Sequence, residues 1–128
     1  MVTKDVRLWL RVEGACVLIL LATLYARAGG KWWVFLVCFF LPDISFVGYL
    51  GGSKAGAYFY NWAHCYLGPA VLGILSLRNW HIGMLAALIW GAHIGFDRML
   101  GYGLKYPEAF AKTHLGWIGK GAGEVGEV

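Results

Sequence analysis

Four long segments of the chain are predominantly apolar, and short polar or glycine-rich stretches separate them. The segments cover residues 8–26, 32–50, 54–77 and 80–100. Each is close to the roughly 20 apolar residues that a helix needs to cross ~30 Å of hydrocarbon. They do not show the strict alternation of apolar and polar residues that is typical of half-buried strands. The pattern therefore predicts four membrane-spanning helices.

The breaks between the four segments are short: residues 28–31, 51–53 and 78–79. Connections of this length cannot cross a bilayer again, so neighbouring helices must run antiparallel. A spanning segment must also bond all of its backbone groups internally, which favours helices. We therefore expect an all-α fold, an integral membrane antiparallel four-helix bundle.

The C-terminal part of the chain has a different character. Residues 101–107 are rich in turn formers, and we expect residues 101–118 to form an interfacial segment on the membrane surface. Residues 119–128 are expected to be a flexible tail, so residues 1–118 form one transmembrane domain. The basic N-terminus and first apolar run resemble a signal peptide, but Glu13 lies close to that run, so we expect a retained first helix.

Composition supports the membrane class. Hydrophobic residues make up 59% of the 128 residues, charged residues only 14%, and the mean hydropathy is +0.60. A soluble domain carries roughly 25% charged residues. The net charge is +4 and the sequence pI about 9.1, but the basic residues lie at the ends of apolar runs, so no nucleic acid partner is expected. The three cysteines are scattered and do not predict a disulfide framework.

The distribution of basic residues predicts the orientation. Cytoplasmic loops of membrane proteins carry an excess of lysine and arginine. We therefore expect a multi-pass protein of the inner (plasma) membrane with both termini in the cytoplasm. Its partners would be the lipid bilayer and a second copy of the chain or a larger membrane complex. One side of the predicted bundle holds Lys4, Arg7, Arg11, Lys54, Arg98, Lys105, Lys112 and Lys120, and the other holds Arg27, Lys31 and Arg78.

Polar residues gather in the cytoplasmic half of the predicted bundle. At a rise of ~1.5 Å per residue, Asp43 lies about 16 Å below the outer face and His93 about 20 Å below it. His93 and Asp97 are four residues apart and share one helix face, as do Asn61 and His64 at a spacing of three. Ionisable groups at this depth are costly, so they normally face the bundle interior or a water-filled cavity.

Two interpretations of this cluster remain open. Two imidazoles and two carboxylates suit zinc, manganese or iron, with Asp43, His64, His93 and Asp97 as ligands of a divalent metal ion. The other interpretation is a buried hydrogen-bond network that ties the helices together. The spacing matches no strict metal-binding motif, so the residues alone favour the network.

Several further residues are candidates around the cluster. Glu13 and Asn61 are candidate catalytic or supporting groups, with Glu13 as general base. Arg98 is expected to extend to the interface or to pair with Asp97 or Glu13. His114 is a candidate for closing the cytoplasmic mouth of the bundle. Gly91 and Gly95 match the small-xxx-small pattern of close helix packing.

Four sequence blocks resemble a known family. The chain is similar to the small bacterial membrane-protein family numbered 4260 among domains of unknown function, from about residue 8 to residue 118. The resemblance implies a four-helix membrane protein and carries no activity. The blocks are residues 42–49 (PDISFVGY), 61–64 (NWAH), 93–106 (HIGFDRMLGYGLKY) and 113–116 (THLG).

Three functions follow as hypotheses. The first is a metal-dependent hydrolase of a lipid-like substrate at the cytoplasmic leaflet, in which the ion activates water. The second is a non-enzymatic accessory subunit or small carrier in which the polar residues form a structural network. The third is a haem- or quinone-binding pocket with His64 and His93 as axial ligands.

Overall fold

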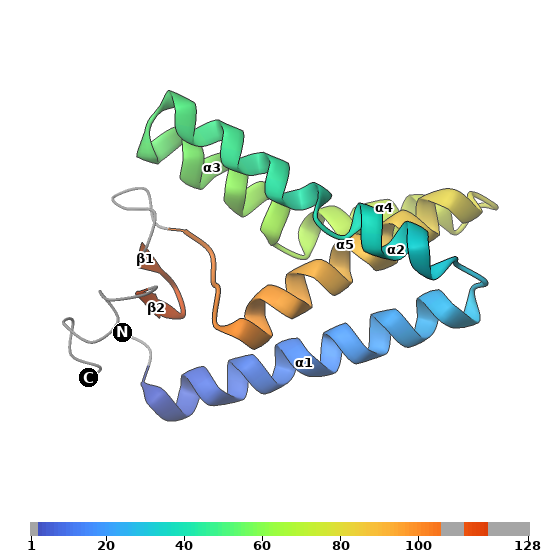
Figure 1. The fold of residues 1–128 in the computed structure, drawn as a ribbon, viewed down its shortest axis with the longest axis horizontal. Helices are drawn as coiled ribbons and strands as arrows, with labels where there is room; N and C mark the ends of the chain where they lie inside the picture. The colour runs from blue at the N-terminus through green and yellow to red at the C-terminus, as the bar shows by residue number, and fades with distance from the viewer. Residues whose placement is uncertain (1–2, 106–111, 118–128) are drawn as a thin grey trace.

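The computed structural model describes residues 3–105 and 112–117, and these residues are almost entirely helical (Figure 1). The tail at 119–128 lies outside the described residues. The helices are α1 (Lys4–Arg27), α2 (Trp32–Cys38), the 3₁₀ helix η1 (Leu41–Gly51), α3 (Ser53–His64), α4 (Leu67–Ser76) and α5 (His81–Leu100). Two strands of two residues each, β1 (Lys112–Thr113) and β2 (Gly116–Trp117), pair antiparallel.

Helix α5 is the centre of the fold. Helix α1 runs along one side of it, α4 packs on another, and η1 and α3 form a hairpin whose η1 arm also contacts α5 (Figure 1). Helix α5 has far more buried residues than any other element, among them His93, Asp97 and Arg98. A polar group on α5 is therefore shielded from several sides at once.

Helices α1 and α5 cross closely at glycines. A Cβ atom added at Gly95 would lie 2.9 Å from the carbonyl oxygen of Gly14 and 2.9 Å from the amide nitrogen of Leu18. A Cβ at Gly91 would lie 2.6 Å from a methyl carbon of Leu21. Only residues without a side chain let the two backbones approach this far. The packing role predicted for Gly95 is confirmed, whereas a Cβ at Gly91 would meet the flexible end of the Leu21 side chain and no backbone atom of α1.

Aromatic side chains build the core between α1, α2 and α5. The rings of Tyr25 and Phe35 lie 5.1 Å apart between centroids, and those of Phe35 and Phe39 lie 5.5 Å apart. The buried Tyr25 hydroxyl donates a hydrogen bond to the carbonyl oxygen of Lys31 at 2.7 Å. This bond joins the end of α1 to the start of α2 and fixes the first turn of the chain.

The all-α class is confirmed, but two of the four expected helices are interrupted. The helix expected at 32–50 is divided into α2 and η1, and the helix expected at 54–77 is divided into α3 and α4. Proline explains both breaks, because its ring collides with the carbonyl group four residues earlier. Pro42 opposes the carbonyl of Cys38, where α2 ends, and Pro69 opposes that of Cys65, which is extended. Four continuous spanning helices are therefore not observed.

The expected interfacial segment at 101–118 is described only in part. After a left-handed turn at Gly101, the chain leaves α5 without regular secondary structure, and Lys105 forms an isolated bridge with Thr113 of β1. Both residues are buried, so this part of the segment packs against the helices. The positions 106–111 and 118 lie outside the described residues.

Two segments are long and apolar enough to cross a membrane: Lys4–Arg27 with 24 residues and Trp32–Gly51 with 20. In each, only 11% of the most apolar window is buried inside the protein. Large apolar side chains such as Trp33, Leu36 and Leu50 are exposed, Leu50 by 89%. Most apolar side chains of these segments thus lie on the protein surface, and only a few, such as Tyr25, Phe35 and Phe39, build its core.

Candidate functional site

Two histidines and two aspartates from three different elements converge on one buried point. Asp43 comes from η1, His64 from the end of α3, and His93 and Asp97 from α5. One ligand atom of each residue lies within 4.8 Å of the other three. The side chains of His64 and His93 are 0% and 1% exposed, that of Asp97 11% and that of Asp43 35%. We call these four residues the His/Asp cluster.

The atoms of the His/Asp cluster are closely and evenly spaced. Nε2 of His64 lies 3.2 Å from Oδ1 of Asp43 and 3.5 Å from Oδ2 of Asp97. Nε2 of His93 lies 3.3 Å from each of the same two oxygens. The two Nε2 atoms are 3.2 Å apart. Five of the six distances between the four ligand atoms therefore fall between 3.2 and 3.5 Å.

This spacing fits a metal ion. Four ligand atoms placed tetrahedrally at ~2.0–2.1 Å from a central ion lie roughly 3.3–3.4 Å from one another. Two imidazole nitrogens and two carboxylate oxygens suit zinc, manganese or iron. A haem held by both histidines would need its iron and ring between them, whereas here the carboxylates approach the same two nitrogens. The geometry does not favour the haem hypothesis.

The break between α3 and α4 positions His64. In a continuous helix the carbonyl oxygens of Ala63 and His64 would accept hydrogen bonds from the next turn. Here side chains of α5 take over that role. The indole Nε1 of Trp90 donates to the Ala63 carbonyl at 2.6 Å, and a guanidinium nitrogen of Arg98 donates to the His64 carbonyl at 2.9 Å. These bonds fasten the end of α3 to α5 beside His93.

The orientation of the His64 ring is fixed on both of its edges and on one face. Its Nδ1 lies 2.9 Å from the backbone carbonyl oxygen of Tyr60, which can only accept, so Nδ1 carries the hydrogen. In the neutral ring Nε2 is then unprotonated and directs its lone pair into the cluster. The Tyr60 ring stacks on that of His64 with 3.8 Å between centroids and 8° between planes.

Asp43 and His93 are oriented by the helix break at Pro42. The backbone N–H of Asp43 donates to the carbonyl of Phe40 at 3.1 Å, within the tight turn that opens η1. The ring of Phe39 contacts that of His93 edge-on at 5.1 Å. Nδ1 of His93 is buried beside the Phe39 backbone without reaching full hydrogen-bond geometry. The helix break thus places the Asp43 carboxylate and the Phe39 ring next to His93 of α5.

Asn61 binds the chain that leaves α5. Its Nδ2 donates to the Lys105 carbonyl at 2.7 Å, and its Oδ1 accepts from the Lys105 amide at 2.6 Å. The Lys105 ammonium lies 4.9 Å from the centroid of the Tyr60 ring, on which His64 also stacks. Burial lowers the pKa of Lys105 to about 8, although the Asp97 carboxylate acts in the opposite direction.

His114 holds the same segment from the other side. The Leu104 amide donates to Nδ1 of His114 at 2.8 Å, and the His114 amide donates to the Leu104 carbonyl at 3.0 Å. Burial lowers the pKa of His114, and the Arg98 guanidinium lowers it further. His114 therefore packs onto the chain after α5 and does not enter the His/Asp cluster.

The other candidate residues lie outside the cluster. Glu13 is exposed on α1, and Asn61 is engaged with Lys105. Arg98 donates to the carbonyl oxygens of His64 and Tyr102, both at 2.9 Å. Trp90 and Tyr60 were not among the candidate residues predicted from the sequence, yet both orient His64. Their spacing offered only a weak signal, because aromatic residues on a helix face are more often simple core residues.

Comparison with known proteins gives a family. The model of the family described as "Domain of unknown function (DUF4260)" matches residues 7–118. The chain therefore belongs to this family, which confirms the resemblance seen in the sequence. No curated protein and no solved structure matches it significantly.

Proposed function

We propose that this DUF4260 protein is an integral membrane metalloprotein whose His/Asp cluster holds one divalent transition-metal ion. The bound ion would activate water for the hydrolysis of a lipid-like substrate. The observation that carries the proposal is the convergence of two imidazole nitrogens and two carboxylate oxygens within 4.8 Å of one another.

The exposed apolar surface supports the membrane environment. Soluble monomers rarely expose contiguous apolar patches larger than a few hundred Å². Here the two spanning segments leave most of their apolar residues on the surface, and the exposed fractions of Leu36, Val37 and Leu50 are 67%, 68% and 89%. Hydrocarbon is the surrounding that makes such a surface favourable. The proposed topology is multi-pass, with both termini in the cytoplasm.

The tautomer of His64 supports a cation over a plain hydrogen-bond network. Because Nδ1 of His64 donates to Tyr60, a neutral ring presents a lone pair to two carboxylate oxygens at 3.2 and 3.5 Å. Lone pairs and carboxylates repel one another unless a metal ion or a bridging proton lies between them. A network without a metal would need a proton in place of the ion, on His64, on His93 or on one of the two carboxylates, within a largely buried cluster.

Hydrolysis needs a face of the ion that water and substrate can reach. Asp43 is the most exposed of the four ligands, with 35% of its side chain accessible, whereas both histidines are closed off. It also belongs to η1, which is separated from α2 by the break at Pro42. We therefore assign the Asp43 side as the approach for water and substrate, while His64, His93 and Asp97 hold the ion.

Metal analysis of the purified protein tests the proposal. Protein extracted in detergent and passed over a desalting column should retain about one ion per chain by inductively coupled plasma mass spectrometry, as four-ligand sites bind tightly. The variants His93→Ala and Asp97→Asn should lose it. Asp5→Asn, a matched change at an exposed carboxylate of α1, should retain it. Equal, substoichiometric metal in all four proteins would refute the metal site.

Two further measurements test the membrane and hydrolase parts separately. The protein should stay in the membrane fraction after an alkaline carbonate wash, and reporter fusions at both ends should respond as cytoplasmic. A metal-loaded preparation should release fatty acid from added glycerolipids, and Asp97→Asn should not. Metal binding without any metal-dependent lipid turnover would leave the ion a structural role and refute the hydrolase.

A further inference from the structure

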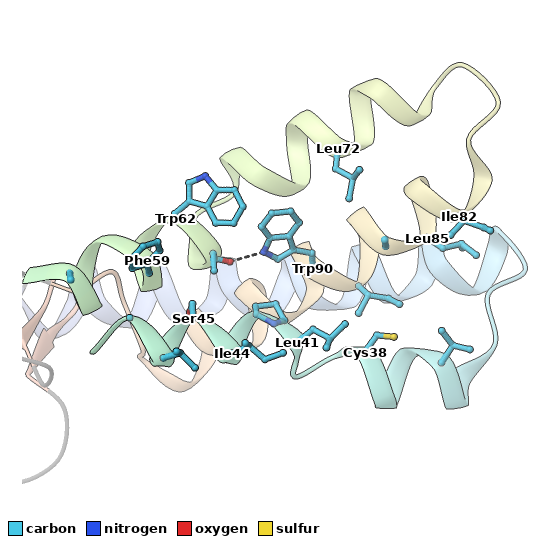
Figure 2. Close-up of a pocket in the computed structure, with 18 of the residues that line it drawn as sticks. Cys38, Leu41, Ile44, Ser45, Phe59, Trp62, Leu72, Ile82, Leu85 and Trp90 are labelled. Atoms are coloured by element: carbon cyan, nitrogen blue, oxygen red, sulfur yellow. Dashed lines mark hydrogen bonds between the residues drawn. The ribbon is translucent and has the colours of Figure 1, made fainter. Parts of the chain in front are cut away.

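An elongated groove runs along the side of the protein between η1 and α2 on one wall and α3, α4 and α5 on the other (Figure 2). Its volume is about 940 Å³, at the upper end of the ~300–1,000 Å³ typical of ligand sites. We call it the lateral groove. Phe59 and Ser45 lie toward one end, Trp90 lies near the middle, and Ile82 and Leu85 lie toward the other end (Figure 2).

The lining is almost wholly apolar. Trp90, whose ring stands in the groove, uses its N–H to bond the Ala63 carbonyl and so presents only its apolar surface (Figure 2). Ser45 is the exception. Its hydroxyl oxygen is buried and has no hydrogen-bond partner among residues 3–105 and 112–117. A buried hydroxyl of this kind is costly unless a bound molecule supplies the missing partner.

The lateral groove shares a wall with the His/Asp cluster. Pro42 and Ala63 line the groove, and the residues that follow them, Asp43 and His64, belong to the cluster. Ser45 lies two residues beyond Asp43 on the same 3₁₀ helix. A molecule in the groove therefore lies against the segment that carries the most exposed ligand of the proposed metal site.

We infer that the lateral groove binds one acyl chain of an ester lipid from the surrounding bilayer, with the Ser45 hydroxyl donating a hydrogen bond to the ester carbonyl. The η1 wall, Leu41–Gly51, is about 20 Å long at ~2.0 Å per residue. One leaflet of a ~30 Å hydrocarbon core is about 15 Å deep, so the wall accommodates a chain of that length.

The Ser45 hydroxyl favours a lipid over a second copy of the chain. A membrane-spanning helix of a second copy has its backbone carbonyl groups already bonded internally, whereas an ester carbonyl embedded in a membrane is free to accept. The groove walls belong in part to the segment Trp32–Gly51, whose apolar surface we place in the bilayer. Lipid molecules therefore surround the groove.

The inference rests on the proposed function only where it names this lipid as substrate. In that reaction the oxygen of water bonds to the carbonyl carbon, and the bond from that carbon to the alkoxyl oxygen breaks. One proton of water ends on the leaving alcohol, and the products are a fatty acid and an alcohol. The binding of the acyl chain itself does not require a metal ion.

Photo-crosslinking tests the acyl-binding groove. The full chain is reconstituted in lipid nanodiscs that contain a phosphatidylcholine with a diazirine on one acyl chain, and the labelled residues are mapped by mass spectrometry. We expect labels concentrated on groove residues such as Trp62, Leu72 and Ile82. Ala86→Trp places a large side chain in the groove from an exposed position of α5 and should abolish these labels. Ala70→Trp, exposed on α4 and not part of the lining, should leave them unchanged.

Cysteine alkylation gives a second reading that does not depend on a bulky variant. Cys38 lines the groove, whereas Cys16 is exposed on α1. Added ester lipid should slow the modification of Cys38 by a small membrane-permeant maleimide more than that of Cys16, which faces bulk lipid or detergent in either case. Ser45→Ala should weaken this protection when an ester lipid is used and not when an alkane of the same length is used.

Three outcomes would overturn the inference. Labels spread evenly over all exposed apolar residues would show no acyl site. Protection of Cys38 that follows protein concentration, with a dimer in native mass spectrometry and no bound lipid, would assign the groove to a second copy. If the wild type binds metal, Asp97→Asn loses it and no lipid is found in the groove, only this inference is refuted. If the groove is labelled in a wild-type protein that binds no metal, only the proposed function is refuted.

Discussion

The substitution Asp97→Asn separates a metal site from a hydrogen-bond network by its effect on metal-dependent stability. Asp97 Oδ2 lies 3.3 Å from Nε2 of His93 and 3.5 Å from Nε2 of His64. Asparagine keeps the shape and one hydrogen-bond acceptor but removes the charge and most of the affinity for a metal. If the cluster is only a hydrogen-bond network, added metal should stabilise neither the wild type nor Asp97→Asn. If it is a metal site, added metal should stabilise the wild type and hardly stabilise Asp97→Asn.

The size of the effect follows from binding linkage. A metal ion present at 100 times its Kd stabilises the folded protein by about 2.7 kcal/mol. At about 4 °C per kcal/mol for a chain of this length, wild-type Tm should rise by roughly 11 °C. If Asp97→Asn weakens binding ~100-fold, the same metal concentration adds only about 0.4 kcal/mol, or roughly 2 °C.

The assay is thermal unfolding in detergent, followed by near-ultraviolet circular dichroism, after chelation and then with added Zn²⁺ or Mn²⁺. Asp5→Asn should show the full wild-type shift, since its side chain is exposed at the start of α1. The reasoning fails if the chelated wild type shows no shift with any divalent metal. It fails equally if Asp97→Asn shifts as much as the wild type does.

Three further predictions concern the parts that support the site. Gly95→Ala should destabilise the packing of α1 on α5 by about 1–3 kcal/mol because its Cβ has no space, whereas Gly73→Ala, whose Cβ would lie 3.8 Å from the nearest atom, should cost far less in thermal unfolding. Arg98→Met should lower metal affinity about 10–100-fold by releasing the end of α3, and an unchanged Kd in a metal titration would contradict this. Since burial lowers the pKa of His114, its neutral form stabilises the fold above pH 6.5, and this contribution is lost as the pH falls below that value. The protection of the Leu104 amide against hydrogen exchange, taken relative to its intrinsic rate at each pH, should fall over that range, and His114→Gln should remove this pH dependence.

The sequence predicted much of the candidate site because ionisable residues within apolar segments normally face the interior of the helix bundle or a water-filled cavity. Helical rise alone placed Asp43, His64, His93 and Asp97 in the cytoplasmic half of the predicted bundle, and the i, i+4 spacing put His93 and Asp97 on one face. The structure brings these four together. That Asp97 and His93 lie on the most buried helix could not be predicted, because burial depends on which helices surround α5.

The supporting contacts were beyond sequence reasoning. Arg98 was expected to pair with an acid, and instead it binds the carbonyl oxygens of His64 and Tyr102. The His64 carbonyl needs a partner because Pro69 interrupts the helix expected at 54–77, and the Tyr102 carbonyl needs one because it follows the end of α5 at Leu100. Asn61 likewise serves the backbone of Lys105, a residue 44 positions away. Such contacts are set by how distant segments fold together.

The sequence by itself determined that this chain is helical and rich in exposed apolar side chains. Its apolar segments, glycine breaks and prolines act through local sterics and hydropathy, which extend over only a few residues. Tertiary structure alone decided that the kinked η1 meets the end of α3 beside the middle of α5, and that two histidines and two aspartates then face one another. The physical reason is that Coulomb interactions and metal ligation depend on distances of a few ångströms between residues up to 54 positions apart, from Asp43 to Asp97. Only the packing of the helices fixes those distances.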